Sequence, residues 1–343
     1  MSIYADIEKT LGDFRLKVKL EAGDEVLALL GASGCGKSMT LKCIAGIVRP
    51  DRGRIEVDGR VLFDSEKHID LSPQQRRTGL MFQNYALFPN MTVLQNIRAG
   101  ARREKDSAAK ERKIQEIMDS FGLAELSAHY PWQLSGGQQQ RTALARLLVS
   151  GPDILLLDEP FSALDSHLRF RLERELAEVI RDFGRTVILV SHDRDEVFRL
   201  SDKIAVMSEG GIETFGEKTA VFARPATRSA AILTGCKNIS PIKKLGQRRL
   251  LALDWGMELE TAEDIGDARY LGIRMHDLCF GPGENAFFCR LVSETENRFS
   301  YTLMFVNGSG SPVGLETDKS VWESLRCGET YIRLPPEKCV LLK

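Results

Sequence analysis

A glycine-rich stretch near the N-terminus has the composition of a phosphate-binding loop. Residues 31–38 read GASGCGKS and satisfy the pattern GxxxxGK[ST], between the apolar run 26–30 and a helix-like segment. In that context glycines let backbone N–H groups close around phosphates, and the helix N-terminus adds its positive end. Lys37 would reach the β and γ phosphates, and Ser38 would offer a hydroxyl to Mg²⁺. The alternative is a plain glycine-rich turn. The predicted contacts come from Gly31, Ala32, Ser33, Gly34, Cys35, Gly36, Lys37 and Ser38.

Two carboxylates follow a second apolar run. Residues 154–157 read ILLL and lead into Asp158 and Glu159. Ligands of open α/β sheets bind outside the carboxyl ends of the strands, which is where these side chains would lie. Asp158 suits the Mg²⁺ shell, and Glu159 suits a general base for a hydrolytic water. Two such carboxylates can also simply cap the next helix, so it is the phosphate loop that favours the catalytic interpretation.

A third motif predicts a second phosphate-binding helix start. Residues 134–138 read LSGGQ and precede the helix-like stretch TALARLLVSG. The Ser135 hydroxyl and the backbone N–H groups after it would bind an anion at the helix N-terminus. One nucleotide does not need two such sites in one subunit.

With these motifs the chain resembles the ATP-binding cassette (ABC) ATPases, whose signature motif reads LSGGQ. In that family two subunits pack head to tail, and the signature of one covers the γ-phosphate that the other holds. The resemblance implies an ATP- and Mg²⁺-dependent homodimer. The signature residues expected at the partner's nucleotide are Ser135, Gly136, Gly137 and Gln138.

The other motifs of the family follow in order. Gln83 matches the Q-loop glutamine, which is expected to contact Mg²⁺ and the attacking water and to sense a membrane partner. Asp165, in the sequence SALD, matches the loop that crosses the dimer interface. His192, after VILVS, matches the switch histidine that contacts the γ-phosphate. The resemblance therefore implies that Glu159, His192 and Gln83 are catalytic, and that Ser38, Gln83 and Asp158 hold the metal.

Two positions depart from the family pattern. Met39 stands where the family usually has a threonine near the α-phosphate, so it is expected to alter nucleotide affinity modestly. The aromatic residue that stacks on adenine is left open, because Phe14 is available but Leu11 can align with that site.

The pattern of apolar residues predicts the elements that carry these motifs. The unbroken apolar runs 26–30, 154–157 and 187–190 are typical of parallel strands buried on both faces. Apolar residues at three- and four-residue steps predict helices at 114–121 and 168–183. The alternation indicates an α/β fold. With the resemblance, we expect a P-loop NTPase of the ABC cassette type over 1–235, with a helical subdomain at about 88–152. A small all-β, OB-like barrel is expected over 236–343.

Composition narrows the classes of partner. The chain has 343 residues, with 47 Lys and Arg against 48 Asp and Glu, so global charge gives no support to a polyanion partner. The highly charged segment 102–113 contains both signs and is typical of a solvated helix face. Seven cysteines form no CxxC pair, which favours a reducing compartment. The first ten residues lack the apolar run of a signal peptide, and no stretch of about 18 apolar residues occurs.

These features distinguish between the functional classes of ABC ATPase. Lys37 and Ser135 are 98 positions apart, which leaves no room for the long coiled coil of a chromosome ATPase. One cassette without membrane helices fits a peripheral importer subunit on the cytoplasmic face of the cell membrane, with integral-membrane permease subunits and an external solute-binding protein as partners and no nucleic acid. The stretch TLGDF and residues 59–83 resemble molybdate importers, relatives of the sulfate and tungstate systems. A sugar, polyamine or iron solute stays open, as does a regulatory or nucleic-acid-associated ATPase.

Overall fold

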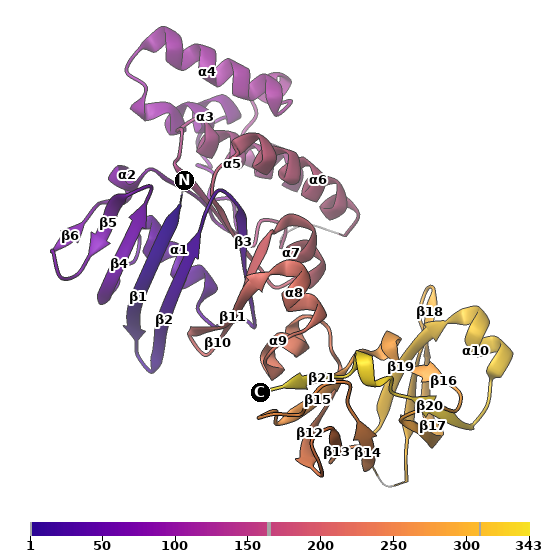
Figure 1. Ribbon diagram of the computed structural model, residues 1–343. Coiled ribbons are helices and arrows are strands. Elements are labelled where there is room, and N and C mark those ends of the chain that lie inside the picture. Colours follow the sequence, from indigo (N-terminus) through magenta and orange to yellow (C-terminus); the bar gives the residue numbers. More distant parts are fainter. Residues whose placement is uncertain (1, 163–165, 309) are drawn as a thin grey trace. The chain divides into compact units, whose positions relative to one another are not determined.

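The computed structural model describes residues 2–162, 166–308 and 310–343. The chain forms two compact units, residues 1–218 and 219–343, and each is described by itself (Figure 1). The helices α8 (Lys218–Ala223) and α9 (Arg228–Leu233) thus lie at the start of the second unit. The domain division after residue 235 stays a prediction.

One mixed sheet of eleven strands, in the order β6-β5-β4-β1-β2-β11-β10-β3-β9-β8-β7, organises the first unit (Figure 1). Strands β10, β3, β9, β8 and β7 are parallel neighbours, whereas β1, β2, β4, β5 and β6 pair antiparallel. The strands are β1 (Ile3–Leu11), β2 (Phe14–Ala22), β3 (Val26–Gly31), β4 (Arg52–Val57), β5 (Arg60–Asp64), β6 (Ile69–Asp70), β7 (Thr78–Met81), β8 (Ile154–Asp158), β9 (Val187–Ser191), β10 (Lys203–Ser208) and β11 (Gly211–Glu217).

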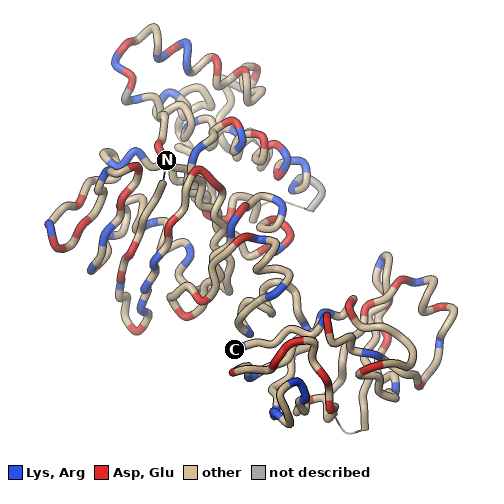
Figure 2. The backbone as a smooth tube through the Cα atoms, in the orientation of Figure 1, with Lys and Arg blue, Asp and Glu red and all other residues tan. Residues whose placement is uncertain are grey.

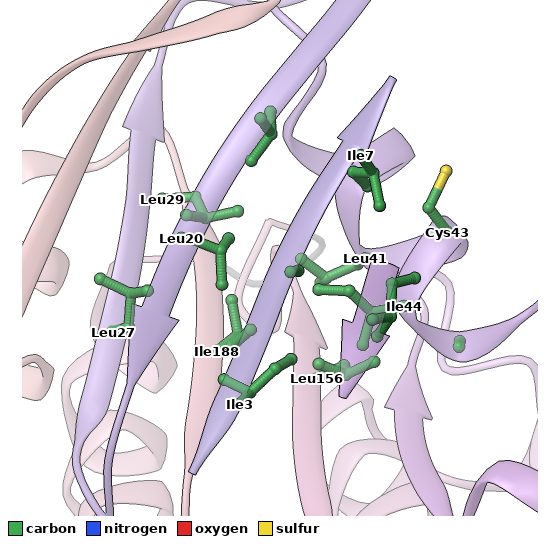
Figure 3. Close-up of a cluster of buried hydrophobic side chains, with 14 of the residues drawn as sticks. Ile3, Ile7, Leu20, Leu27, Leu29, Leu41, Cys43, Ile44, Leu156 and Ile188 are labelled. Atoms are coloured by element: carbon green, nitrogen blue, oxygen red, sulfur yellow. The ribbon is translucent and has the colours of Figure 1, made fainter. Parts of the chain in front are cut away.

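Helices cover both faces of the parallel strands, which explains their unbroken apolar sequences. Leu156 of β8 packs into a core with Leu41 and Ile44 of the helix after the phosphate loop (Figure 3). Leu155, one residue earlier, points to the other face and joins a core with Leu172. Successive side chains of a strand point to opposite faces, so a strand buried on both has no polar position.

The helices of the first unit follow the predicted periodicity. Leu172, Leu176 and Ile180, spaced four residues apart, are buried on one face of α6. The helices α3, α4 and α5 share a separate core that contains Ile97 and Ile114. The helices are α1 (Lys37–Ala45), α2 (Pro73–Arg76), α3 (Val93–Gly100), α4 (Ser107–Ser120), α5 (Gly136–Leu148), α6 (Ser166–Phe183) and α7 (Arg194–Leu200), with 3-10 turns η1 (Ala101–Arg103), η2 (Ala124–Leu126) and η3 (Pro131–Gln133).

The second unit is built on two five-stranded sheets, β14-β13-β12-β15-β21 and β16-β20-β17-β18-β19. Side chains of both sheets meet in one core, which fits the predicted OB-like domain, and a short helix contributes Trp322 to it. Its elements are β12 (Asn238–Lys244), β13 (Arg249–Ala252), β14 (Met257–Glu260), β15 (Tyr270–Ile273), η4 (Met275–Asp277), β16 (Cys279–Phe280), β17 (Ala286–Glu296), β18 (Ser300–Val306), β19 (Val313–Asp318), α10 (Lys319–Leu325), β20 (Glu329–Arg333), η5 (Pro336–Lys338) and β21 (Val340–Leu342).

A buried arginine fixes the far end of α1. The Arg76 guanidinium donates to the carbonyl oxygens of Cys43 and Ile44 at 2.8 and 2.9 Å, and it pairs with Asp70 at 3.0 Å. The last carbonyls of a helix have no partner within it, so Arg76 satisfies the Ile44 carbonyl and gives the Cys43 carbonyl a second donor beside the Gly46 N–H. The position of α1, and with it the phosphate loop, therefore depends on Arg76.

We expect Arg76→Ala to lower the free energy of unfolding by about 3 kcal/mol, because it leaves the buried Ile44 carbonyl without its donor and removes the shorter of the two ion pairs of Asp70. Urea unfolding followed by circular dichroism measures the change. The neighbouring Arg77, whose side chain is 55% exposed, is the matched control. Arg77→Ala should stay within about 0.5 kcal/mol of the wild type. Equal effects of the two variants would contradict the role of Arg76.

Candidate functional site

Four parallel strands bring the predicted residues to one edge of the sheet. Strands β3, β9, β8 and β7 are adjacent in that order, so their carboxyl ends lie side by side. The phosphate loop follows β3, His192 follows β9, Glu159 follows β8, and Gln83 lies two residues beyond the end of β7. Motifs that are more than 150 residues apart in sequence thus form one site, at the edge where ligands of open α/β sheets bind.

The phosphate loop turns tightly around the Lys37 ammonium. Lys37 is only 5% exposed, and its Nζ donates to the carbonyl oxygens of Gly31 and Ala32 at 2.7 and 2.9 Å. The ammonium is therefore held inside the loop instead of extending into solvent. The exposed apex of the loop, residues 32–34, leads into the N-terminus of α1. A cation and free N–H groups at a helix start are the arrangement that binds phosphate.

Two glycines of the loop are required by its geometry. A Cβ atom on Gly31 would lie 2.5 Å from the Met207 carbonyl oxygen, which is backbone and cannot move aside. Gly36 caps α1 with a φ of 108°, a left-handed conformation, and a Cβ there would lie 2.6 Å from Leu16. Side chains at these positions would open the loop, so the motif's glycines serve both backbone conformation and close packing.

The donor set beside the loop suits Mg²⁺. The Ser38 hydroxyl donates to Asp158 Oδ1 at 2.7 Å, and Asp158 is 7% exposed. Burial raises the pKa of the Asp158 carboxyl, and Glu159 beside it adds to the effect. A carboxylate that has lost its solvent gains from a nearby cation. Hydroxyl and carboxylate oxygens are ligands that Mg²⁺ prefers. In the described parts of the chain, no group of three or more His, Cys, Asp or Glu could hold a metal ion.

Glu159 is the centre of a three-residue contact. Its Oε2 accepts a hydrogen bond from Gln83 Nε2 at 3.4 Å, and its Oε1 lies 3.3 Å from His192 Nδ1. Its backbone has a φ of 47°, held by the N–H bond to the Val190 carbonyl at 2.9 Å. A left-handed conformation of this kind is strained in a non-glycine residue and is often found at functional sites. A carboxylate, an amide and an imidazole together can orient and deprotonate a water molecule.

The signature residues form a separate feature. Ser135 caps α5 in a reciprocal capping box, with Ser135 N–H donating to Gln138 Oε1 at 2.8 Å. Gly136 and Gly137 open the helix. Within the described residues, no hydrogen bond or ion pair connects this helix start to the phosphate loop. The predicted interface residue Asp165 lies outside the described residues.

The loop that carries Gln83 is held by α5. Tyr85 and Ala86 both have a positive φ, at 60° and 43°. The guanidinium of Arg146 donates to their carbonyl oxygens at 3.0 and 2.8 Å, and the Tyr85 hydroxyl donates to the Pro160 carbonyl at 3.2 Å. Sequence reasoning missed Arg146, because an arginine near a helix end usually serves solubility or the helix dipole. The contact joins the signature helix to the Gln83 loop.

The other side chains predicted near the nucleotide differ in their exposure and in their distance from the phosphate loop. Cys35 is buried in the loop and Met39 packs partly against the first core, so neither side chain extends freely toward solvent. Phe14 lies against the loop, since its ring tip would be 3.1 Å from a Cβ on Gly36. Leu11 is 44% exposed at the neighbouring hairpin. Phe14 is therefore the aromatic side chain next to the phosphate loop.

Comparison with known proteins identifies the family. Residues 14–162 match the ABC transporter family model. The sulfate/thiosulfate import ATP-binding protein CysA 2 of Chromobacterium violaceum is 41% identical over 75% of this chain and 69% of its own length. The chain belongs to the ATP-binding proteins of ABC importers. This importer ATPase is also 40% identical to the molybdenum import ATP-binding protein ModC of Paramagnetospirillum magneticum, over 79% of the chain and 76% of that protein.

Further relatives and a solved structure widen the comparison. ATP-binding proteins of a spermidine/putrescine importer of Bacillus cereus and a ferric-ion importer of Haemophilus influenzae are 44% and 41% identical over 63% and 65% of the chain. A dimeric ATP-binding cassette, MJ0796 bound to ADP and Pi, superposes with a TM-score of 0.54 and 28% identity, over 64% of this chain and 99% of that one. The importer ATPase is therefore an ATP-hydrolysing enzyme with the ABC cassette fold.

The lengths of the helices and the distribution of charged residues describe the outside of the protein. Among the described residues, every helix is too short or too polar to cross a membrane. Figure 2 shows Lys and Arg interspersed with Asp and Glu along both units, which is typical of a solvated surface.

We expect Glu159→Gln to slow ATP hydrolysis by about 10³-fold, since an amide cannot accept the proton of the attacking water. ATP affinity should be retained, because Lys37 and the loop are untouched. Single-turnover hydrolysis and nucleotide titration measure the two effects separately. Asp195→Asn, which neutralises an exposed carboxylate on α7, serves as the control. Turnover near the wild-type rate in Glu159→Gln would remove Glu159 from the base role.

Proposed function

We propose that this importer ATPase hydrolyses two ATP molecules at the interface of a head-to-tail homodimer and so powers solute uptake. The observation that carries the proposal is the contact of Glu159 with Gln83 and His192, beside a phosphate loop. That arrangement supports hydrolysis in particular, because binding alone needs no carboxylate aimed at the γ-phosphate edge.

The residues of this chain have distinct roles in the proposed reaction. Lys37 and the loop N–H groups hold the phosphates, and Ser38, Asp158 and Gln83 hold Mg²⁺, which supplies charge neutralisation at the phosphates when bound. Glu159 accepts a proton from the attacking water as the water oxygen bonds to the γ-phosphorus. The bond between that phosphorus and the β–γ bridging oxygen breaks, and ADP leaves with phosphate as the second product. Gln83 and His192 orient Glu159 and the water through their contacts. Positioning and electrostatic stabilisation account for most of the rate enhancement in such a reaction.

The separate helix start of α5 supports the dimer. Ser135 is exposed, and the first N–H groups of a helix have no partner within it. A second copy that brings its γ-phosphate to this helix start would satisfy them. The dimeric MJ0796 cassette is a precedent for such a pairing. Met39, Gly136, Gly137 and Gln138, together with Asp165, belong to the nucleotide contacts in this proposal.

We expect Ser135→Arg to prevent the ATP-driven dimer, because a large cation would occupy the space of the partner's phosphates. In a Glu159→Gln background, ATP should double the mass seen by light scattering, and adding Ser135→Arg should abolish this. Trp132, three residues before Ser135, is 75% exposed, whereas Trp255 and Trp322 are 2% and 1% exposed. Acrylamide quenching of tryptophan fluorescence therefore reports mainly on Trp132, and dimerisation should protect this residue from the quencher. A dimer that still forms with Ser135→Arg would contradict the trans arrangement.

Coupling to permease subunits is proposed to run through the Gln83 loop. Arg146 ties this loop to the signature helix, and Tyr85 ties it to Pro160 beside Glu159. Movement of a membrane partner against residues 83–88 would thus reach both halves of the composite site. In this proposal the protein lies at the cytoplasmic face of the membrane, and an external solute-binding protein delivers the solute.

The proposed solute is molybdate or a related oxyanion such as tungstate or sulfate. The two oxyanion-importer relatives named above align over 75% and 79% of the chain, against 63% and 65% for the polyamine and iron relatives. The longer alignments support the oxyanion class. The nucleotide site itself carries no information on the solute, since the ATPase need not contact it.

Uptake in cells tests the solute. Cells that make only Glu159→Gln should lose most uptake of radiolabelled molybdate or sulfate, because the transporter lacks its energy source. Uptake of labelled spermidine and ferric iron should match that of cells making Asp195→Asn, which controls for expression of a variant. Loss of spermidine or iron uptake, with oxyanion uptake intact, would replace the proposed solute class.

A further inference from the structure

A buried carboxyl group lies next to the loop that carries His192. Glu196, in the first turn of α7, is 3% exposed. The hydroxyl of Ser191, the last residue of β9, interacts with this carboxyl, and this interaction by itself lowers the pKa of Glu196. His192 is the next residue in the chain. Glu196 is therefore one hydrogen bond and one peptide unit away from the histidine that contacts Glu159.

The hydrogen bonds at the start of α7 differ from those of a capping box. Asp193 caps α7, and a glutamate three residues later usually turns back to the N–H of the cap residue. Here the Asp193 N–H donates to Ser191 Oγ at 3.0 Å instead. The Asp193 carboxylate accepts from the N–H groups of Asp195 and Glu196 at 2.9 and 3.2 Å. The Glu196 carboxyl is thus buried instead of capping the helix. The Ser191 hydroxyl contacts two groups, the Asp193 N–H and the Glu196 carboxyl.

The charges around Glu196 balance without it. Asp193 and Glu173 of α6 face it, together with Arg169 of α6. Arg169 pairs with Asp193 at 2.9 Å, and Arg199 of α7 pairs with Glu173 at 2.6 Å. Two cations and two anions already cancel. A negative charge on Glu196 would be a third anion that the group does not compensate, which is costly in a buried position.

The hydrogen bonding of Glu196 agrees with a neutral acid. Its Oε1 is buried and has no hydrogen-bond partner in the part of the chain that the structure describes. An ionised carboxylate normally gathers several donors, so an oxygen without one favours the protonated group. Burial raises the pKa of Glu196 to about 8, with smaller contributions from Asp193 and Glu173, and together these outweigh the lowering by the Ser191 hydrogen bond and by Arg169.

We propose that Glu196 is a positioning residue that works as a neutral carboxylic acid, holding Ser191 so that His192 stays directed toward Glu159. Ionisation of Glu196 would place a third negative charge beside Asp193 and Glu173 and would displace the Ser191–His192 segment. Alkaline conditions would then lower hydrolysis without any change in the nucleotide-contacting residues. This inference rests on the proposed role of His192 in hydrolysis.

The pH profile of kcat tests the proposal. Given a pKa of about 8, the neutral fraction of Glu196, and with it wild-type kcat, should fall about tenfold between pH 7 and pH 9. Glu196→Gln keeps a neutral group of the same shape, so its kcat should match the wild type at pH 7 and lack this loss at pH 9. Asp195→Asn, on the same helix at an exposed position, should retain the wild-type profile. An identical alkaline loss in Glu196→Gln would overturn the proposal.

A second measurement needs no turnover. A carboxyl whose pKa is raised in the folded state stabilises that state below its unfolded pKa, and the contribution is lost as the pH rises through about 8. Wild-type thermal stability relative to Glu196→Gln should therefore decrease from pH 5 to pH 8 and level off above about pH 9. A pH-independent difference would contradict the neutral acid. If the wild type hydrolysed no ATP, the proposed function would fail, and this measurement would still decide the protonation of Glu196.

Should Glu196→Gln fail to fold, Ser191→Ala gives an independent readout, because it leaves the carboxyl but removes its partner. It should lower kcat at pH 7 with the KM for ATP unchanged, since the phosphate loop keeps its contacts. An unchanged kcat would overturn the positioning role.

Discussion

The chemistry of this protein depends on four parallel strands that end at the same edge of one sheet. Strands buried on both faces have no polar position along their length, so every group that meets the nucleotide must follow a strand end. The phosphate loop, Glu159, His192 and Gln83 each follow such an end, and Asp158 is the last residue of β8. Helix packing on both faces, with Leu155 and Leu156 pointing opposite ways, fixes those ends.

This constraint explains how much could be predicted from sequence. Local patterns such as GASGCGKS or ILLLDE contain both the strand and the residues after it, so β3, β8, β9 and the groups beyond them were predictable. The unbroken runs gave no indication of the antiparallel strands β1, β2 and β4, because a strand buried on one face alternates apolar and polar residues instead, as β2 does. The helix α10 was not predictable either, because its seven residues are too few to show a helical period.

Contacts made by charged side chains with backbone escaped prediction for a different reason. Arg76 and Arg146 satisfy carbonyl groups that belong to distant segments, and no local pattern identifies the acceptor. Glu196 lies three residues after the cap residue Asp193, which is the spacing of a capping box. The Asp193 N–H instead donates to the hydroxyl of Ser191, two residues earlier in the chain. Two local hydrogen-bond patterns compete for the same N–H here, and spacing alone does not decide between them.

Arg146 binds residues 85 and 86 through their backbone, which affects how freely the sequence there can vary. The guanidinium holds carbonyl oxygens, which every residue type possesses. The connection to α5 therefore does not depend on the side chain at position 86, where the φ of 43° alone restricts which residues fit. In the proposed coupling, a substitution at this position would change the surface that meets the membrane partner and leave the link to α5 in place. A link made through backbone atoms thus separates the requirements of the connection from those of the loop's side chains.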